Sequence, residues 1–189
     1  MKFVYATVFA ALVAGPAMAV DFRPAMESYL ETEIRTWAED PAIVGAIGAQ
    51  NAVTGGYDQA RVIDLDNAWR AEIGAAAMPT ITPVLTGAAA DFLRERVGAS
   101  AGAITEIFIM DAQGLNVAAS GLTSDYWQGD EAKFTETYGK GAGAVHFGEV
   151  EFDESSQTYQ AQISVTVTDP ATGQPIGAIT VGVDAAHLM

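Results

Sequence analysis

Residues 107–131 read IFIMDAQGLNVAASGLTSDYWQGDE. The segment begins as an apolar strand, turns at residues 111–114, continues as a second strand of small residues, and ends in a loop of aromatic and acidic residues. An antiparallel hairpin fixes backbone positions, and a polar aromatic loop beside it can supply recognition groups. This segment therefore predicts one wall of a small-molecule pocket built on an antiparallel sheet.

The sequence around this hairpin continues with the two-residue alternation that is typical of strands. Between residues 158 and 168, Ile163 and Val165 point to one face, while Gln160 and Gln162 point to the other. The polar face either meets water or lines a cavity beneath the loop 126–131. Five strands are predicted, at 104–111, 115–120, 144–152, 158–168 and 175–184.

Three helices are predicted before the first strand. A long amphipathic helix covers 24–47, with either a kink or a break and immediate restart at Asp40 and its following proline. A second helix covers 64–73 with Asp64 as its cap, and a third begins at Thr82. Helices first and a meandering sheet afterwards predict an α+β fold, with the apolar face of the sheet packed on the long helix.

The first nineteen residues have the pattern of a secretory signal peptide. Lys2 precedes an apolar run at 3–14, and Ala17-Met18-Ala19 forms an A-x-A cleavage site. We therefore expect a signal peptide at 1–19, a mature protein at 20–189 without a membrane span, and a periplasmic or secreted location. Retention of the segment as an uncleaved anchor stays open.

The composition of the remaining 170 residues suits one domain that is helical over 20–100 and a sheet over 104–184. The chain has no cysteine, so packing rather than disulfides must stabilise it. Its formal net charge of −15 leaves no basic surface for nucleic acid, and an anionic membrane would repel it.

The hairpin and loop resemble a known family. A D-x-x-G hairpin followed by S-x-x-x-x-D-Y and Q-G-D-E is similar to the Cache or PDC sensor domains, which are PAS-like and extracytoplasmic. The matching residues are Asp111, Gly114, Ser120, Asp125, Tyr126, Gln128, Gly129, Asp130 and Glu131, and LDNAW at 65–69 extends the resemblance. It implies a single five-stranded antiparallel sheet with a long N-terminal helix on one face and a ligand on the other.

The loop supplies three of the predicted ligand-binding residues. Tyr126 and Trp127 offer flat apolar contact with a polar edge, and Asp130 offers a carboxylate. Two other interpretations stay open: Trp127 fills the core, or Asp125 or Asp130 caps the short helix that contains Phe134.

Two more predicted ligand-binding residues come from the last strands. Gln162 lies on the predicted polar face, and Asp184 ends the final strand. The resemblance implies a role for Asp184, since amino-acid-binding relatives keep an aspartate there for the ligand's ammonium group. The alternative is that Asp184 caps a helical turn at 185–188.

The distribution of basic residues favours a cationic ligand. Amino-acid-binding relatives place an arginine beside the aromatic pair, whereas here Lys133 and Lys140 are the only lysines or arginines after Val97. A carboxylate ligand would lack its bidentate partner, so an amine or another cationic metabolite is expected.

Metal and enzyme signals are weak. Glu149, Glu151 and Asp153 share a strand face that His146 does not, which is typical of a solvated acidic surface; weak calcium binding stays open. The chain has no cysteine nucleophile, G-x-S-x-G, H-E-x-x-H or P-loop. We therefore expect a non-enzyme without metal or cofactor.

These observations predict a secreted or periplasmic sensor domain for a small polar or cationic metabolite. Because residues 20–189 contain neither a membrane span nor an output domain, we expect it to act through a membrane receptor or another signalling partner. Its long helix is a candidate contact for that partner or for a homodimer. The alternatives are a structural or interaction protein whose pocket is closed, and an uncharacterised hydrolase.

Overall fold

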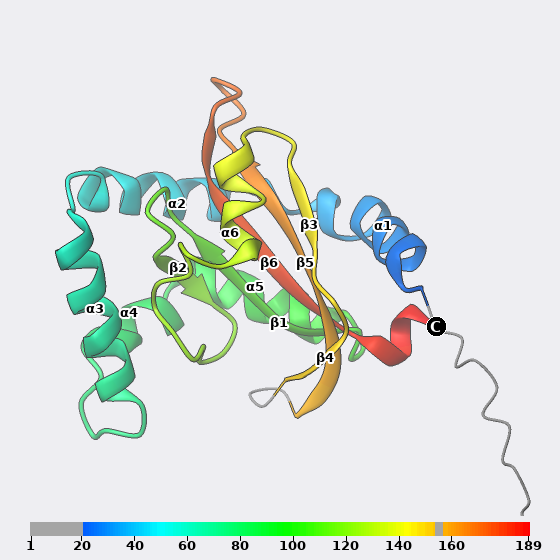
Figure 1. The fold of residues 1–189 in the computed structure, drawn as a ribbon, viewed down its shortest axis with the longest axis horizontal. Coiled ribbons are helices and arrows are strands. Elements are labelled where there is room, and N and C mark those ends of the chain that lie inside the picture. The colour runs from blue at the N-terminus through cyan, green and yellow to red at the C-terminus, as the bar shows by residue number, and fades with distance from the viewer. Residues whose placement is uncertain (1–20, 154–156) are drawn as a thin grey trace, which may run out of the picture.

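The computed structural model describes residues 21–153 and 157–189, so the predicted signal peptide lies outside the described residues. These residues form one antiparallel sheet in the order β2-β1-β6-β5-β3, and β4 also pairs with β5 (Figure 1). The strands are β1 Ile104–Met110, β2 Asn116–Ala119, β3 Val145–Phe147, β4 Glu151–Asp153, β5 Thr158–Thr168 and β6 Pro175–Asp184.

The predicted strand at 144–152 is in fact two strands, so the described sheet has six strands rather than five. Phe147 pairs with Ile163 of β5, whereas Glu151 pairs with Gln160. The four residue steps from Phe147 to Glu151 therefore lie opposite only three steps along β5, as at a β-bulge. At this irregularity the Gly148 amide still donates to the Gln162 carbonyl at 2.8 Å.

The predicted long helix is interrupted. α1 covers Arg23–Thr32, a 3-10 turn η1 covers Ile34–Thr36, and α2 covers Pro41–Thr54. The Asp40 carboxylate caps α2 by accepting from the Ala42 amide at 2.9 Å. Of the two predicted alternatives at this position, the break with a restart is confirmed.

The second predicted helix begins earlier than expected. α3 covers Gln59–Glu72 and is capped by Asp58, which accepts from the Arg61 amide at 2.8 Å. The prediction that Asp64 caps this helix is wrong, because Asp64 lies on its exposed face. The buried side chains of α3 are Val62, Asp66 and Trp69, whereas Ile73, the residue that follows the helix, is 45% exposed.

The third predicted helix consists of two helices, α4 Ile81–Leu85 and α5 Ala88–Ala99. Gly87 separates them with φ of +100°, a conformation that strongly favours glycine. The prediction of one continuous helix from Thr82 is therefore wrong.

The helices are short relative to a lipid bilayer. α2 and α3, at 14 residues each, fall below the roughly 20 residues that a crossing requires. Within residues 21–153 and 157–189, no helix has both the length and the hydropathy of a membrane span.

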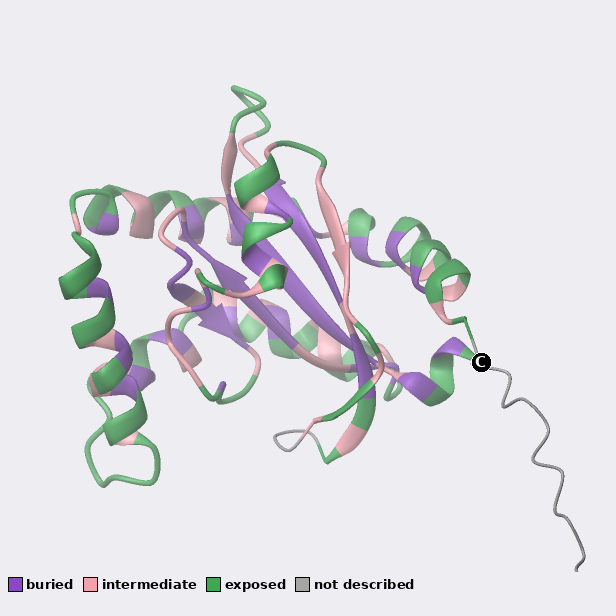
Figure 2. Cartoon of the chain, in the orientation of Figure 1, coloured by how far each residue is buried: buried purple, intermediate pink, exposed green. Residues whose placement is uncertain are grey.

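One face of the sheet carries the main core, as the alternation in the sequence predicted. Ile163 and Val165 of β5 and Ile179 and Val181 of β6 pack in one buried cluster with α1, α2 and α5 (Figure 2). The helical residues of this cluster include Met26, Leu30, Ile43, Ile47, Ala90 and Leu93.

The opposite face is covered by shorter elements. α6 Ala132–Thr135 and the 3-10 turn η2 Tyr138–Lys140 lie over β5 and β6, on the side of the sheet away from α5 (Figure 1). Phe134 of α6 packs in a second cluster with Phe108 and Met110 of β1, and Trp69 of α3 belongs to the same cluster. Polar side chains on this face include Gln160, Gln162, Ser164 and Thr180.

Candidate functional site

The floor of the candidate site is a partly buried carboxylate held by two amides. Glu106 of β1 projects from the polar face, and its Oε1 accepts hydrogen bonds from Gln160 Nε2 at 2.8 Å and Gln162 Nε2 at 3.1 Å. Gln160 Oε1 in turn accepts from the Thr105 hydroxyl. Because the sheet fixes both glutamines, Glu106 is held in place before any ligand arrives.

Burial raises the pKa of the Glu106 carboxyl above its ordinary value. The hydrogen bonds from Gln160 and Gln162 and the positive charge of Lys133 oppose this rise, whereas the negative charge of Asp153 adds to it. The burial effect outweighs the hydrogen bonds, so ionised Glu106 lacks full compensation for the water it has lost. A cation beside it would supply that compensation.

The roof of the site comes from the loop after β2 and from the start of α6. Lys133 Nζ lies 2.9 Å from Glu131 Oε2, donates to Gln128 Oε1 at 3.2 Å, and sits 5.4 Å from the centre of the Phe108 ring. Thr123 and Ser124 complete this side of the site. Lys133 is therefore already bound to protein acceptors.

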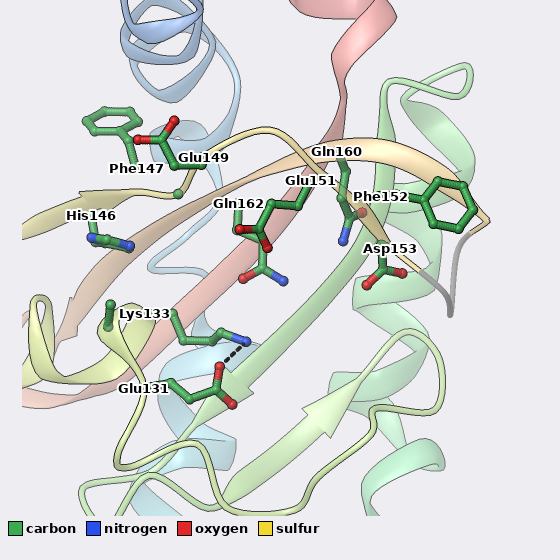
Figure 3. Close-up of a pocket in the computed structure, with 12 residues that line it drawn as sticks. Glu131, Lys133, His146, Phe147, Glu149, Glu151, Phe152, Asp153, Gln160 and Gln162 are labelled. Carbon is green, nitrogen blue, oxygen red and sulfur yellow. Dashed lines mark ion pairs between the residues drawn. The ribbon is translucent and has the colours of Figure 1, made fainter.

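Two adjoining cavities lie between the floor and the roof. An inner cavity of about 270 Å³ is lined by Glu106, Phe108, Gln128 and the residues that it shares with the outer one. The outer cavity of about 460 Å³ extends toward β3 and β4. In Figure 3, Gln162, Glu151 and Asp153 converge on the outer cavity above the Lys133–Glu131 ion pair. The shared residues are Lys133, Asp153 and Gln162.

The roof loop is attached to α3 rather than to the sheet alone. Asp66 Oδ1 accepts from the backbone amides of Tyr126 at 2.9 Å and Trp127 at 3.1 Å. The Trp69 ring stacks on Tyr126 with centroids 5.3 Å apart, and its indole N–H donates to the Thr123 carbonyl at 2.9 Å. Asp66 and Trp69 of the sequence LDNAW thus hold the loop that contains the sequence DYW.

The five predicted ligand-binding residues do not gather in one place. Gln162 lines both cavities. Tyr126 faces the other way, into a groove of about 680 Å³ between α2, α5 and β2. Burial, followed by the negative charge of Asp111, raises the pKa of Tyr126 to about 12, so its hydroxyl stays protonated.

Trp127, Asp130 and Asp184 lie outside the lining of both cavities. Trp127 is half-buried on the hairpin turn, where its indole N–H donates to the Gln113 carbonyl at 2.8 Å. Asp130 is exposed, and Glu131 rather than Asp130 holds the N-cap position of α6.

For Asp184, the capping alternative is confirmed. Its Oδ1 accepts from the Ala186 amide at 2.7 Å at the start of the 3-10 turn η3 Ala185–Leu188. Its Oδ2 accepts from the Thr158 hydroxyl at 3.0 Å. Both carboxylate oxygens therefore have protein donors.

The inference that no arginine lies beside the loop needs correction. Arg70 of α3 reaches the loop, and its Nη2 lies 2.8 Å from Asp125 Oδ1 and 2.8 Å from Asp66 Oδ2. The contact was missed because Arg70 is 55 residues before Asp125 in the sequence. Arg70 is paired with two carboxylates.

His146, Glu149, Glu151 and Asp153 all line the outer cavity. Across residues 21–153 and 157–189, however, no three histidine, cysteine or acidic side chains come close enough together to hold a metal ion. Figure 3 shows Glu149 and His146 well apart.

The sequence contained one signal for the main site residue that was missed. Glu106 is the only charged residue in ITEIFIM, and it shares its parity with Phe108 and Met110 on the face opposite the main core. A carboxylate inside a buried strand needs a partner or a function. Gln160 was also missed, although it has the same parity as Gln162.

The raised pKa of Glu106 predicts a pH-dependent effect of the variant Glu106→Gln. A carboxyl whose pKa is higher in the folded than in the unfolded state favours folding when protonated, and this contribution is lost as pH rises through the folded pKa. Glu106→Gln should therefore be more stable than the wild type at pH 7, with the difference shrinking toward pH 4. Urea unfolding at both pH values measures this, and a variant less stable at pH 7 would contradict it.

Comparison with known proteins finds similar solved structures at low sequence identity. No model of a known protein family matches the chain, and a sequence search of curated proteins finds no match. The sensor domain of the histidine kinase DctB from V. cholerae is 13% identical, with a TM-score of 0.41 over 88% of this chain and 58% of that one.

Two chemoreceptor domains are similar to the same degree. The ligand-binding domain of Tlp3 from Campylobacter jejuni, in complex with 4-methylisoleucine, is 11% identical with a TM-score of 0.43, covering 90% of this chain and 65% of that one. The ligand-binding domain of CtaA from Pseudomonas fluorescens, in complex with L-valine, is 12% identical with a TM-score of 0.40, covering 82% of this chain and 64% of that one. The chain thus spans less than two thirds of each of these three. The structural neighbours of this chain are Cache/PDC-type sensor domains of histidine kinases and chemoreceptors.

Proposed function

We propose that this protein is an extracytoplasmic sensor domain that binds a small polar or cationic metabolite on the sheet face beneath the roof loop. The observation that carries the proposal is the partly buried carboxylate of Glu106, which the side-chain amides of Gln160 and Gln162 hold at the floor of a cavity. A fixed acceptor in a partly dry pocket is what recognition of an ammonium or similar donor group requires.

The charges around the cavity support a cationic ligand. Glu106, Glu131, Glu151 and Asp153 line one or both cavities, against a single lysine. That lysine is already paired with Glu131 at 2.9 Å. An incoming cation would meet an acidic surface with little competing positive charge, whereas an incoming carboxylate would be repelled.

The dimensions support a metabolite rather than a peptide. The two cavities measure about 270 and 460 Å³, which falls near the range of roughly 300 to 1,000 Å³ typical of small-molecule sites. The open space beneath the roof loop favours ligand binding over the alternative in which the pocket is closed.

Signalling would use the connection between the roof loop and α3. Gln128 and Ser124 belong to the loop to which Asp66 and Trp69 are hydrogen-bonded. A ligand that contacts either residue would therefore contact that loop. A ligand can shift such an equilibrium only if it binds one loop position more tightly than another. We therefore propose that the partner, a membrane receptor or another signalling protein, senses the position of α3 relative to the sheet.

Titration calorimetry with putrescine and ethanolamine, and with succinate as the anionic comparison, tests this function. Glu106→Gln should weaken amine binding by about 10- to 100-fold, because a hydrogen bond to a charged group contributes about 1.5 to 3 kcal/mol. Glu95→Gln on the exposed face of α5 removes the same charge away from the cavity and should leave affinity unchanged. Amine affinity should also fall as pH is lowered through the raised pKa of Glu106.

Three results would contradict the proposal. They are tight binding of succinate with inert amines, equal losses in Glu106→Gln and Glu95→Gln, and amine affinity that stays constant on acidification. The additional variant Asp130→Asn tests the prediction for that exposed loop carboxylate, since a loss of affinity there would extend the site to the outer side of the loop.

A further inference from the structure

A groove of about 680 Å³ lies beside β2, on the side of the sheet that α2 and α5 cover. Val117 and Ala118 of β2 form its floor, α2 and the first turn of α5 form its walls, and Tyr126 of the roof loop also lines it. None of its described lining residues carries a charge, in a chain with 24 acidic and 9 basic residues. It shares no described residue with the two cavities at Glu106, so it is a separate space.

Two tyrosine hydroxyls at this groove lack a protein partner. Tyr57 and Tyr126 are half-buried, and neither hydroxyl forms a hydrogen bond within residues 21–153 and 157–189. Neither oxygen is among the fully buried atoms without a partner, so both hydroxyls remain accessible to a ligand. Tyr57 contributes to the raised pKa of Tyr126, after burial and Asp111, which indicates that the two hydroxyls lie near each other. The groove therefore offers two reachable O–H donors within an apolar lining.

The α2 wall of the groove is made of small residues, which are Ala42, Gly45, Ala46 and Ala49. Packing does not require the glycine, because a Cβ added at Gly45 would meet no atom within 4 Å. Glycine inside a helix is destabilising relative to alanine, so Gly45 weakens α2 and leaves the groove wider. Gly48 is equally free of contacts but lies outside the lining. A small-residue face alone therefore does not define the site, whereas Gly48 provides a matched control for Gly45.

The size of the groove and the charge of the chain favour a small molecule over a second copy of the protein. The volume of about 680 Å³ lies within the range of roughly 300 to 1,000 Å³ that is typical of small-molecule sites. A second copy would bring the same formal net charge of −15, and this repulsion opposes close association. It would also have to place an acceptor opposite each tyrosine hydroxyl, since a hydroxyl enclosed without one is costly.

We propose that this groove is a second binding site, which takes a neutral, largely apolar molecule whose carbonyl group accepts a hydrogen bond from the Tyr126 hydroxyl. The small residues of α2, together with Val53 and Leu65, supply apolar contact for the body of the ligand. A charged ligand would give up its hydration to an uncharged wall, which disfavours both ammonium and carboxylate groups. A carboxylate at Tyr126 would also be repelled by the negative charge of Asp111, which acts on that hydroxyl.

Nuclear magnetic resonance of alanine methyl groups tests the site in the intact protein, because alanines line the groove on several sides. Acetophenone is the probe, and it should shift the signals of Ala46, Ala49 and Ala118 along a saturating curve while Ala161 of β5 stays unmoved. Ethylbenzene has nearly the same shape without the carbonyl group. It should bind about 2- to 10-fold more weakly, because one hydrogen bond is missing. Benzoate and benzylammonium, as the charged comparisons, should each bind at least about fivefold more weakly than acetophenone.

Three variants assign the effect to the groove. Tyr126→Phe removes only the hydroxyl, so it should lower acetophenone affinity to that of ethylbenzene and leave ethylbenzene affinity unchanged. Gly45→Leu fills the groove and should weaken acetophenone binding by about tenfold or more, because the side chain occupies the place of the ligand. Gly48→Leu makes the same change outside the lining and should leave the affinity unchanged. Both leucine variants should raise the melting temperature, since leucine favours a helix over glycine, and this shows that each variant is folded.

The proposal fails if the groove alanines do not respond to acetophenone in the wild type, or if the two leucine variants affect binding equally. Unchanged acetophenone affinity in Tyr126→Phe would overturn the role of the hydroxyl. Benzoate or benzylammonium binding as tightly as acetophenone would overturn the choice of a neutral ligand. Groove signals that change on dilution of the protein without any probe would show that a second copy covers the groove, and this would also overturn the proposal. The wild-type titration and dilution series need no variant.

Discussion

Replacing Trp69 with alanine is expected to lower the free energy of unfolding by about 3 to 5 kcal/mol, the range for removing a large aromatic side chain from a core. Trp69 has no exposed surface and packs among Ile81, Val84 and Phe108. Its loss also removes the stack on Tyr126 and the hydrogen bond to the Thr123 carbonyl. Urea unfolding followed by far-ultraviolet circular dichroism measures the change.

Trp69→Phe separates packing from the hydrogen bond. It keeps a ring against Tyr126 but leaves the Thr123 carbonyl without the indole donor, so a smaller loss of about 1 to 2 kcal/mol is expected. If both variants lose less than 1 kcal/mol, α3 does not hold the roof loop. In that case the proposed route from ligand to α3 would fail as well.

Asp111→Ala should lower the free energy of unfolding by about 3 to 4 kcal/mol, because several hydrogen bonds to one buried charged group are lost together. Asp111 has no exposed surface. Its Oδ1 accepts from the amides of Gln113 and Leu115 at 2.9 and 3.0 Å, and thereby closes the hairpin turn. Its Oδ2 accepts from Thr54 at 2.7 Å and Gln50 at 3.0 Å, and thereby ties α2 to the same turn.

Asp111→Asn is the matched control. The remaining amide oxygen can serve the turn or the helix, but the new NH₂ group cannot accept, so a loss of about half that of the alanine variant is expected. Differential scanning calorimetry of the three proteins gives the order. An asparagine variant as unstable as the alanine variant would show that the charge, rather than the number of acceptors, stabilises this junction.

Two aspartates, Asp111 and Asp66, attach the D-x-x-G turn and the D-Y loop to the helices. Asp111 fastens the hairpin to α2 on one side, and Asp66 fastens the loop to α3. Gly114 is required in the turn, since its φ is +80° and an added Cβ would lie 2.6 Å from the Gly129 Cα. The turn and the loop are therefore packed directly against each other, with no room for a side chain.

Much of the fold followed from local patterns. Alternation in β5 and β6 predicted which side chains face the helices, because a strand places successive residues on opposite faces whatever surrounds it. The hairpin at 111–114 followed in the same way, and so did an interruption of the helix at Pro41, although the choice between a kink and a restart did not, since proline and glycine act on the backbone locally. Helix ends at Asp58 and Gly87 were missed, because several nearby residues could equally cap or break a helix.

Only part of the candidate site was predicted from the sequence. Gln162 was predicted on the polar face and lies in the cavity. Glu106 was not predicted as its partner, because the pairing of β1 with β6 and of β6 with β5 brings together residues 56 apart. Arg70 was likewise missed at the loop.

The sequence by itself determined the α+β class, the polar and apolar faces of the sheet, and the turn that begins the roof loop, because each depends on neighbours within a few residues. Only the tertiary structure decided which charged groups meet. Coulomb energy and desolvation depend on distances through space and on burial. Neither distance nor burial can be calculated from the spacing of residues along the chain. For that reason the partly buried Glu106 and the paired Arg70 became visible only in the folded chain.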